Sequence, residues 1–315
     1  MRVLHVVEAE GRYVASLREA ATPTLRPGEV LIRVAASGVN RADLSQIAGR
    51  YPAPPGEPQG LGLEVSGTVE GSDGWVCALL AGGGHAEYAA APEGQVFLMP
   101  ARLEPVAAAG IPEAFLTAFV NLVVEARVEA GQTVLVHAGA SGVGLAAIQI
   151  ARYLGARVIA TVGTQEKAKL ACEAGADDVI LYAQQDFEVE TKRLTDGKGV
   201  HVIYDGVGKT TFDKDLEVLR QRGYLVLFGA SSGPVPPFDL AKLGHKGSLF
   251  ITRPTLVHHM ATNEELQKRA TDVLTMIATG RIKLRIEHIY PLKEAQQAHR
   301  ELEARKTTGK LLLIP

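Results

Sequence analysis

The chain has 315 residues, of which 46% are hydrophobic and 22% charged, and its formal net charge at pH 7 is -2. That length allows two domains with separate cores, while the mixed charges leave no basic patch for nucleic acid or a membrane surface. The N-terminus lacks a signal-peptide pattern and no apolar run is long enough to cross a bilayer, so we expect a cytoplasmic protein that acts on small molecules. Cys77 and Cys172 are the only cysteines, which excludes a disulfide framework or a four-cysteine zinc lobe.

The first hundred residues predict a compact, mostly β domain. The opening residues, MRVLHVVEAEGRY, are typical of a strand, and β-like runs follow at 31–39, 63–70, 75–81 and 86–91. Glycine and proline separate these runs, as turns do in antiparallel sheets. Helical patterns are scarce in this part of the chain.

From about residue 113 the pattern changes to short apolar strands that alternate with helices. This alternation is typical of βαβ units and of a doubly wound parallel sheet covered on both faces. Helices are expected between the first five strands, at 263–280 and at 292–305, while KLLLIP at 310–315 is expected to return to the first domain as a strand. The six expected strands of the parallel sheet are 133–138, 157–162, 178–182, 201–205, 224–228 and 248–252.

The segment HAGASGVG at 137–144 joins a predicted strand to a predicted helix. Its glycines, Gly139, Gly142 and Gly144, allow a tight turn, and the free N–H groups of the following helix favour a pyrophosphate. The spacing G-x-x-G-x-G differs from the G-x-G-x-x-G of most dinucleotide-binding folds. The alternative is a turn that only packs the helix against the strand.

The end of the next strand indicates which dinucleotide binds. NAD-binding sheets place a carboxylate there to hold the ribose 2′-hydroxyl, whereas this chain has Thr161-Val162-Gly163-Thr164. Thr164 is a good N-cap and Lys167 falls in the first helical turn, so a hydroxyl, free N–H groups and an ammonium converge where a 2′-phosphate would lie. We therefore expect NADPH, with a solvated surface role for Lys167 as the alternative.

A serine-hydrolase site is the competing chemistry at the glycine-rich turn. Ser141 lies between strand and helix, but the nucleophile elbow of those enzymes reads G-x-S-x-G, which this chain lacks there. No Asp and His follow at later strand ends in the order that a catalytic triad needs. We therefore expect Ser141 to serve the turn and not to act as a nucleophile.

Many motifs, in one order along nearly the whole chain, resemble the zinc-free quinone oxidoreductases of the medium-chain dehydrogenase/reductase family. They include GVNRADLSQIAGRYP, LGLEVSGTVE, HAGASGVG, VIYDGVG and HKGSLFITRPTL. The front half is most similar to the p53-inducible branch, and the back half is also similar to bacterial NADPH:quinone reductases. The resemblance implies a GroES-like β domain over 1–117, completed by 254–315, and a Rossmann domain with a six-stranded parallel sheet over 118–253.

The same resemblance implies an NADPH crevice between the two domains. Asn40 is the expected donor to a developing oxyanion, and Tyr51 the expected lid or donor over the nicotinamide. The residues expected to bind the cofactor are Arg41, Ala42, Asp43, Leu44, Ser45, Val120, Gly142, Val143, Gly163, Thr164, Lys167, Tyr182, Val207, Phe228, Gly229, Ala230, Ser231, Pro254, Thr255, Leu256 and Arg305.

In zinc-dependent proteins of similar domain order, the first domain contains the motif G-x-C-x-x-D and, slightly later, Gly-His-Glu. Here Asn40 stands in place of the thiolate and Leu63 in place of the imidazole, so no tetrahedral zinc site is expected. No ligand spacing connects the histidines at 85, 137, 258 and 259, which are expected to pack or to face solvent.

The resemblance also implies that the chain lacks about a dozen residues near position 72 that usually form a hairpin in this family.

The resemblance implies transfer of hydride from NADPH to a quinone. Reduction of activated C=C bonds in enals or enones is the alternative, because both substrates are conjugated carbonyls, and a low-turnover NADPH-binding redox sensor is a third possibility. Neither nucleic acid nor a membrane is an expected partner. A homodimer is expected, because the apolar strand SLFIT at 248–252 would form an exposed sheet edge.

Overall fold

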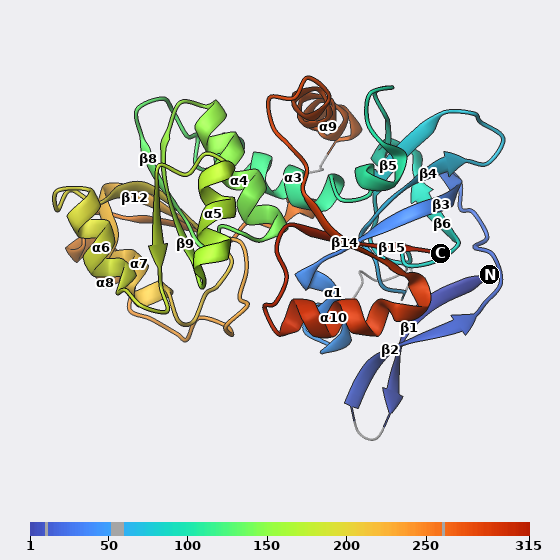
Figure 1. Ribbon diagram of the computed structural model, residues 1–315, viewed down its shortest axis with the longest axis horizontal. Helices are drawn as coiled ribbons and strands as arrows, with labels where there is room; N and C mark the ends of the chain where they lie inside the picture. The colour runs from blue at the N-terminus through green and yellow to red at the C-terminus, as the bar shows by residue number, and fades with distance from the viewer. Residues whose placement is uncertain (10–11, 52–59, 260–261) are drawn as a thin grey trace. The chain divides into compact units, whose positions relative to one another are not determined.

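The computed structural model describes residues 1–9, 12–51, 60–259 and 262–315. The chain forms two compact units (Figure 1), of which the first comprises Met1–Leu116 with Met260–Pro315 and the second Thr117–His259. In the part of the chain that the structure describes, no helix is both long and apolar enough to cross a membrane.

The first unit is built on a seven-stranded sheet with the order β14-β15-β3-β4-β5-β7, in which β6 also pairs with β3. β15 pairs antiparallel with β3, so the C-terminal segment does return to the first unit as predicted. The four predicted strand runs are also confirmed. The seven strands are β3 (Glu29–Val39), β4 (Glu64–Val69), β5 (Trp75–Leu79), β6 (Tyr88–Pro92), β7 (Val96–Leu98), β14 (Ile286–Pro291) and β15 (Lys310–Ile314).

Around this sheet lie a hairpin and a few helices. The expected first strand is β1 (Arg2–Ala9), and it pairs along its whole length with β2 (Arg12–Glu19), which the sequence did not predict. The predicted helix at 263–280 is α9 (Asn263–Ala278), whereas the one at 292–305 divides into a 3-10 turn and α10 (Ala295–Glu303). The remaining helices here are α1 (Arg41–Ile47), α2 (Pro105–Ala108) and α3 (Pro112–Phe119), which continues into a π-helical turn at Val120–Glu125.

The connection between β4 and β5, near position 72, is short. β4 and β5 pair antiparallel from Glu64 opposite Leu79 to Thr68 opposite Trp75. A short turn joins them, in which the Ser72 N–H donates to the Val69 carbonyl over 2.9 Å. The short connection therefore allows full pairing of β4 with β5.

The second unit is a six-stranded, fully parallel sheet with the order β10-β9-β8-β11-β12-β13. α4 and α5 cover one face, and α6 and α7 the other (Figure 1). All six predicted strands and the four helices between the first five are confirmed. The elements are β8 (Thr133–Val136), α4 (Gly142–Tyr153), β9 (Arg157–Val162), α5 (Gln165–Glu173), β10 (Asp178–Leu181), α6 (Phe187–Leu194), β11 (Val200–Asp205), α7 (Phe212–Val218), β12 (Leu219–Leu227), α8 (Ala241–His245) and β13 (Phe250–Thr252).

Because helices cover both faces of the parallel sheet, its central strands are apolar at nearly every position. Leu135, Ile159, Ile203 and Leu225 are fully buried and form one cluster across neighbouring strands. This continuous burial explains why the strands could be recognised without a polar and apolar alternation.

The core of the first unit contains a buried ion pair. The Glu64 carboxylate and the Lys310 ammonium lie 2.6 Å apart, with side chains 0% and 4% exposed. Asn40 completes the group, since its amide nitrogen donates to Glu64 over 2.8 Å and its amide oxygen accepts from Lys310 over 2.6 Å. Glu64 also accepts the backbone N–H of Glu113 over 2.8 Å. Four stretches of the chain therefore meet at one pair of charges.

Replacing Lys310 with methionine should destabilise the protein strongly, because Glu64 would stay buried without its counter-charge. We expect a loss of about 3–5 kcal/mol in the free energy of unfolding, measured by urea denaturation. The double variant Lys310→Met with Glu64→Gln is the control and should recover much of this loss. A Lys310→Met protein as stable as the wild type would contradict the pairing.

Candidate functional site

The carboxyl ends of the parallel strands form the candidate site of the second unit. β8 lies between β9 and β11, so the chain winds outward in both directions from this point. In open α/β sheets, ligands bind at such a switch point, outside the carboxyl ends of the strands. The loops that leave β8, β9, β11 and β12 there, with the first turns of α4 and α5, contain ten of the 21 residues predicted to bind cofactor.

The turn after β8 brings α4 close to the strand end. The Ser141 hydroxyl caps this helix by accepting the Gly144 N–H over 3.0 Å. A Cβ at Gly144 would lie 2.3 Å from the Ala138 carbonyl oxygen, so only glycine allows this approach. The N–H groups of Gly142 and Val143 belong to the first helical turn, which has no intrahelical acceptors. This turn can therefore receive an anion.

The loop after β9 has the form expected for a phosphate and contains no carboxylate up to Thr164. Thr164 caps α5 through its hydroxyl, which accepts the Lys167 N–H over 3.3 Å, so Lys167 lies in the first turn. The Tyr182 side chain covers Gly163, where a Cβ would lie 2.8 Å from its hydroxyl oxygen. Gly163, Thr164, Lys167 and Tyr182 are thus brought to one edge of the sheet.

The loops after β11 and β12 are fixed to each other by a buried carboxylate and by backbone contacts. Asp205 accepts the N–H groups of Val207 and Gly208 over 2.6 and 3.1 Å. The Ser231 N–H donates to the Gly206 carbonyl over 3.0 Å. Phe228 stacks on buried Tyr204 with ring centroids 4.1 Å apart. Val207 and the segment 228–231 therefore form one ordered rim at the same strand ends.

Other predicted residues lie elsewhere in the second unit. Val120 is buried in the π-helical turn that follows α3. The segment 254–256 follows β13 and leads into a 3-10 turn at Leu256–His259.

The first unit contributes two arginines that are far apart in the sequence. The Arg41 guanidinium donates to the Leu302 carbonyl over 3.2 Å, which ties α1 to α10. Burial, with a smaller effect from the charge of Arg305, lowers the pKa of Arg41 below its ordinary value. The two cations therefore lie close enough to repel each other, an arrangement that a phosphate would relieve.

Asn40 and Tyr51, the residues predicted to act on substrate, occupy different surroundings. Asn40 is 8% exposed, and its amide hydrogens are directed to Glu64 and to the Gly38 carbonyl. Tyr51 follows α1 and is 41% exposed. Asn40 is thus bonded to the buried ion pair of Glu64 and Lys310. The sequence did not indicate a role for Glu64 or Lys310, because both residues lie within strands.

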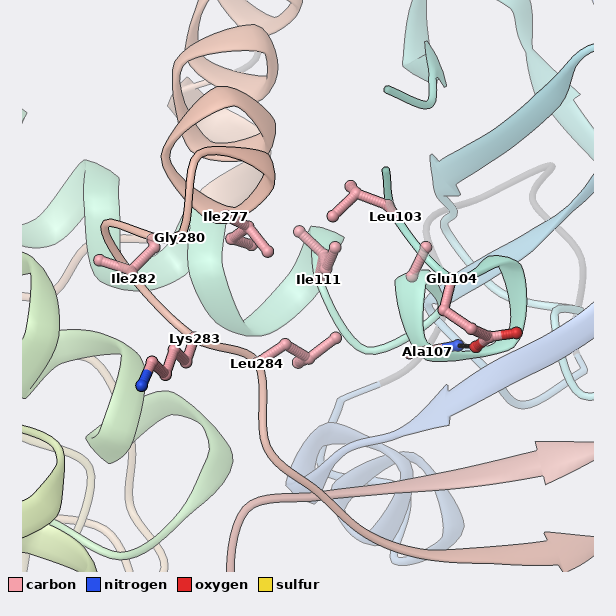
Figure 2. Close-up of a pocket in the computed structure, with 10 residues that line it drawn as sticks. Leu103, Glu104, Ala107, Ile111, Ile277, Gly280, Ile282, Lys283 and Leu284 are labelled. Carbon is pink, nitrogen blue, oxygen red and sulfur yellow. Dashed lines mark hydrogen bonds between the residues drawn. The ribbon is translucent and has the colours of Figure 1, made fainter. Parts of the chain in front are cut away.

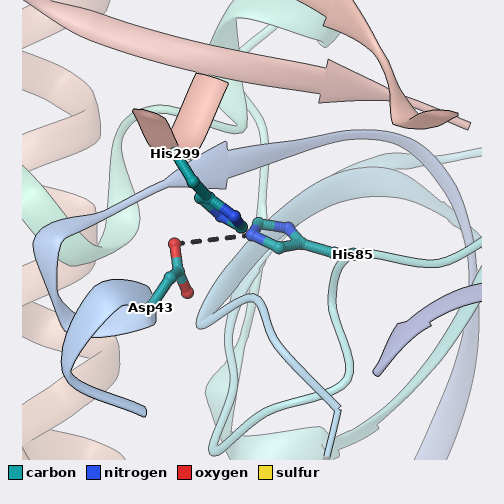
Figure 3. Close-up of side chains that lie close together, drawn as sticks. All are labelled: Asp43, His85 and His299. Carbon is teal, nitrogen blue, oxygen red and sulfur yellow. Dashed lines mark ion pairs between the residues drawn. The ribbon is translucent and has the colours of Figure 1, made fainter. Parts of the chain in front are cut away.

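Asp43 belongs to a second buried group (Figure 3), with His85 and His299. Burial alone would raise the pKa of Asp43, but the two histidines hold it below its usual value. Burial lowers the pKa of His299 to about 4. His85 is buried, as expected of a packing histidine, and its ring faces the Asp43 carboxylate. The sequence did not indicate a role for His299. Their positions in the sequence gave no signal, since the three residues come from α1, a loop and α10.

A shallow hollow of about 330 Å³ lies in the first unit (Figure 2). Its lining is mostly apolar, and none of the predicted site residues is part of it. The lining residues are Leu103, Glu104, Ala107, Ala108, Ile111, Ile277, Gly280, Ile282, Lys283 and Leu284.

Comparison with known proteins shows what this arrangement is similar to. Residues 26–101 match the family described as the alcohol dehydrogenase GroES-like domain, and residues 142–275 match the zinc-binding dehydrogenase family. Quinone oxidoreductase 1 of Escherichia coli K12 is 39% identical over 299 residues, which cover 91% of each chain. The chain belongs to the quinone oxidoreductase family.

Solved structures of relatives agree over the full length. A mycobacterial protein in complex with NADPH is 41% identical, with a TM-score of 0.93 and complete coverage of both chains. The Escherichia coli quinone oxidoreductase in complex with NADPH has a TM-score of 0.92 at 36% identity, covering 100% of this chain and 99% of that one. The predicted fold, a GroES-like domain with a six-stranded Rossmann sheet, is confirmed.

Although one matched family is described as zinc-binding, positions 40 and 63 of this quinone oxidoreductase family member do not suit zinc. Asn40 and Leu63 supply neither thiolate nor imidazole. The Lys310 ammonium also lies 2.6 Å from the Asn40 amide oxygen. A cationic side chain thus already occupies the neighbourhood of position 40, and a zinc ion there would be repelled.

A buried histidine supports the glycine-rich turn of the second unit. At the end of β8, His137 contacts Asp215 through Nε2 and Thr161 through Nδ1, each over 2.8 Å. Burial alone would disfavour the charged ring, but the Asp215 carboxylate outweighs this and raises the pKa of His137 above its ordinary value. The folded protein therefore holds a proton that the unfolded chain loses near pH 6.5.

The stability that the His137 proton supplies should be present below pH 6.5 and decline as the pH rises through the folded pKa of His137. Burial raises the pKa of Asp215 to about 7, so the charge of this carboxylate weakens at lower pH. Asp215→Asn should therefore cost more at pH 6 than at pH 9, by about 1–2 kcal/mol in the free energy of unfolding. Urea denaturation at both pH values measures this. Asp213→Asn, on the exposed face of α7, is the control and should cost little at either pH. Equal losses at pH 6 and pH 9 for Asp215→Asn would contradict the pairing.

Proposed function

We propose that the protein reduces quinones with NADPH. The observation that carries this proposal is the edge of the parallel sheet, where a capped glycine turn and a second capped loop without a carboxylate suit a dinucleotide with a 2′-phosphate. Membership of the quinone oxidoreductase family and the NADPH complexes of its relatives support the same assignment.

The residues present fit NADPH at two places in the second unit. The first turn of α4, at Gly142 and Val143, would hold the pyrophosphate, and the Gly163–Lys167 loop with Tyr182 would hold the 2′-phosphate. The rim of Val207 and 228–231 would bound the nicotinamide half. Arg41 and Arg305 of the first unit are proposed to complete the phosphate contacts.

NADPH, when bound, supplies the hydride that an electron-poor acceptor receives. The protein would contribute positioning, exclusion of water and donors to the developing oxyanion. Tyr51 is the proposed donor or lid, since it is partly exposed. Asn40 could donate only by exchanging a partner, because its amide hydrogens are directed to Glu64 and Gly38. We also propose that the reaction needs no zinc.

A second candidate activity is reduction of an activated C=C bond. A relative from Burkholderia sp., described as 2-haloacrylate reductase, is 35% identical over 304 residues. Its structure matches this chain with a TM-score of 0.82. A conjugated carbonyl could therefore replace the quinone as acceptor, with the cofactor bound in the same way.

Two finer proposals concern relatives and assembly. The motif GVNRADLSQIAGRYP supports a relation to the p53-inducible branch.

A homodimer is supported by β13, the last strand of the parallel sheet, which pairs only with β12 among the described strands. Phe250 on this strand is 43% exposed although apolar, and an exposed apolar edge favours pairing with a second copy.

Steady-state turnover with NADPH decides between the candidate activities. We expect kcat/KM for a small para-quinone to exceed that for an enal and for a 2-haloacrylate, and a secondary alcohol with NADP⁺ to give no measurable rate. Exhaustive chelation should leave the quinone rate unchanged. A higher kcat/KM for the enal or haloacrylate would assign the C=C activity, and no turnover of any acceptor would contradict both.

Lys167→Ala should weaken NADPH selectively, because an ammonium in the first turn of α5 would bind the 2′-phosphate and not the nicotinamide. We expect a loss of about 1–3 kcal/mol in NADPH binding with little change for NADH, measured by fluorescence titration. Lys169→Ala is the matched control, since Lys169 lies on the same helix with a side chain 79% exposed. Equal affinity of the wild type for NADPH and NADH would refute this reading of the loop.

A further inference from the structure

The group of Asp43, His85 and His299 has the composition of a metal site, and it is separate from the zinc positions of related dehydrogenases. The three side chains lie together within the first unit (Figure 3), and their candidate ligand atoms are all within 4.8 Å of one another. Each residue is buried, with exposures of 0%, 0% and 5%. Two imidazoles and a carboxylate suit zinc and other divalent transition metals.

Three of the four ring nitrogens of His85 and His299 lack a hydrogen-bond partner among the described residues. Among the described residues, no hydrogen-bond partner exists for Nε2 of His85 or for either ring nitrogen of His299. Buried polar groups in folded proteins are nearly always hydrogen-bonded or bound to an ion or water. These unpartnered ring nitrogens beside the buried Asp43 carboxylate therefore point to a ligand.

The geometry of His85 and Asp43 already suits coordination. His85 Nε2 lies 3.4 Å from Asp43 Oδ2, which is the separation of about 3.4 Å that two ligand atoms have in a tetrahedral zinc site. The ring of His299 has its centroid 6.0 Å from that of His85 and must move closer. Among the described residues, no hydrogen bond fixes either nitrogen of that ring.

Outer contacts orient two of the three ligands, as they do in protein metal sites. Nδ1 of His85 contacts the buried Ser37 hydroxyl over 2.8 Å, which directs Nε2 toward Asp43. The Asp43 carboxylate accepts the N–H of Asn40 over 2.7 Å and that of Gly62 over 3.3 Å. These contacts hold the ligands before any ion arrives and lower the entropy lost on binding.

We propose that Asp43, His85 and His299 form a binding site for one divalent transition-metal ion, with zinc the favoured occupant. Asp43 lies on α1 and His299 on α10, two helices that pack together and are also linked by Arg41 and the Leu302 carbonyl. A bound ion would lock these helices to the loop that carries His85. Three protein ligands leave a fourth position for water.

Zinc titration of the full chain, after treatment with EDTA and dialysis, tests this proposal by calorimetry. We expect one ion per chain with a Kd in the micromolar range or below, and a melting temperature that rises with zinc concentration because only the folded chain contains the site. Cobalt should give the visible absorption bands of a four- or five-coordinate ion. These readouts involve neither NADPH nor quinone, so their failure is distinguishable from failure of the proposed function.

Variants locate the ion. His299→Gln should weaken zinc at least tenfold, and Ser37→Ala should weaken it about tenfold by releasing the His85 ring. His258→Gln is the control, since His258 is an exposed histidine outside the group, and should leave the affinity unchanged. If His299→Gln does not fold, X-ray absorption of the zinc-loaded wild type replaces it and should show two imidazole ligands. Absence of stoichiometric binding, binding that survives His299→Gln, or fewer than two imidazoles would overturn the proposal.

Discussion

The ion pair between Lys310 and Glu64 is the interaction on which the first unit depends. A buried ammonium and a buried carboxylate compensate each other's charge, because either group buried alone would carry a large desolvation cost. The pair joins the last strand of the chain to β4, and through Asn40 it fixes the start of α1. The C-terminal return is thus fastened to the sheet by charge as well as by the pairing of β15 with β3.

The start of α1 is consequently surrounded by two buried polar groups with different chemistry. Asn40 faces the ammonium of Lys310, whereas Asp43, one helical turn later, faces His85 and His299. The ammonium disfavours a metal at the first place, while the imidazoles and carboxylate favour one at the second. The proposed metal site therefore lies one helical turn from position 40, where this chain lacks a zinc ligand.

In the second unit, close approach between backbone segments determines the shape of the candidate cofactor site. Gly144 lets α4 begin directly against the Ala138 carbonyl, and Gly163 lets Tyr182 lie over the loop after β9. Asp205 then uses its carboxylate to organise the loop after β11. The candidate cofactor edge is formed largely by main-chain N–H groups held in place in this way, with Ser141 as the cap of α4.

The sequence by itself determined the six parallel strands, the four helices between the first five of them and the return of the C-terminal strand, because burial periodicity and glycine turns are local signals. It also indicated the glycine turn and the loop with Thr164 and Lys167, since these lie within short contiguous motifs. Only the tertiary structure decided the partners of Asn40, the pairing of Lys310 with Glu64, and the convergence of Asp43, His85 and His299. Those contacts join residues from 24 to 270 positions apart, and no short motif spans such separations, so only folding brings these groups together.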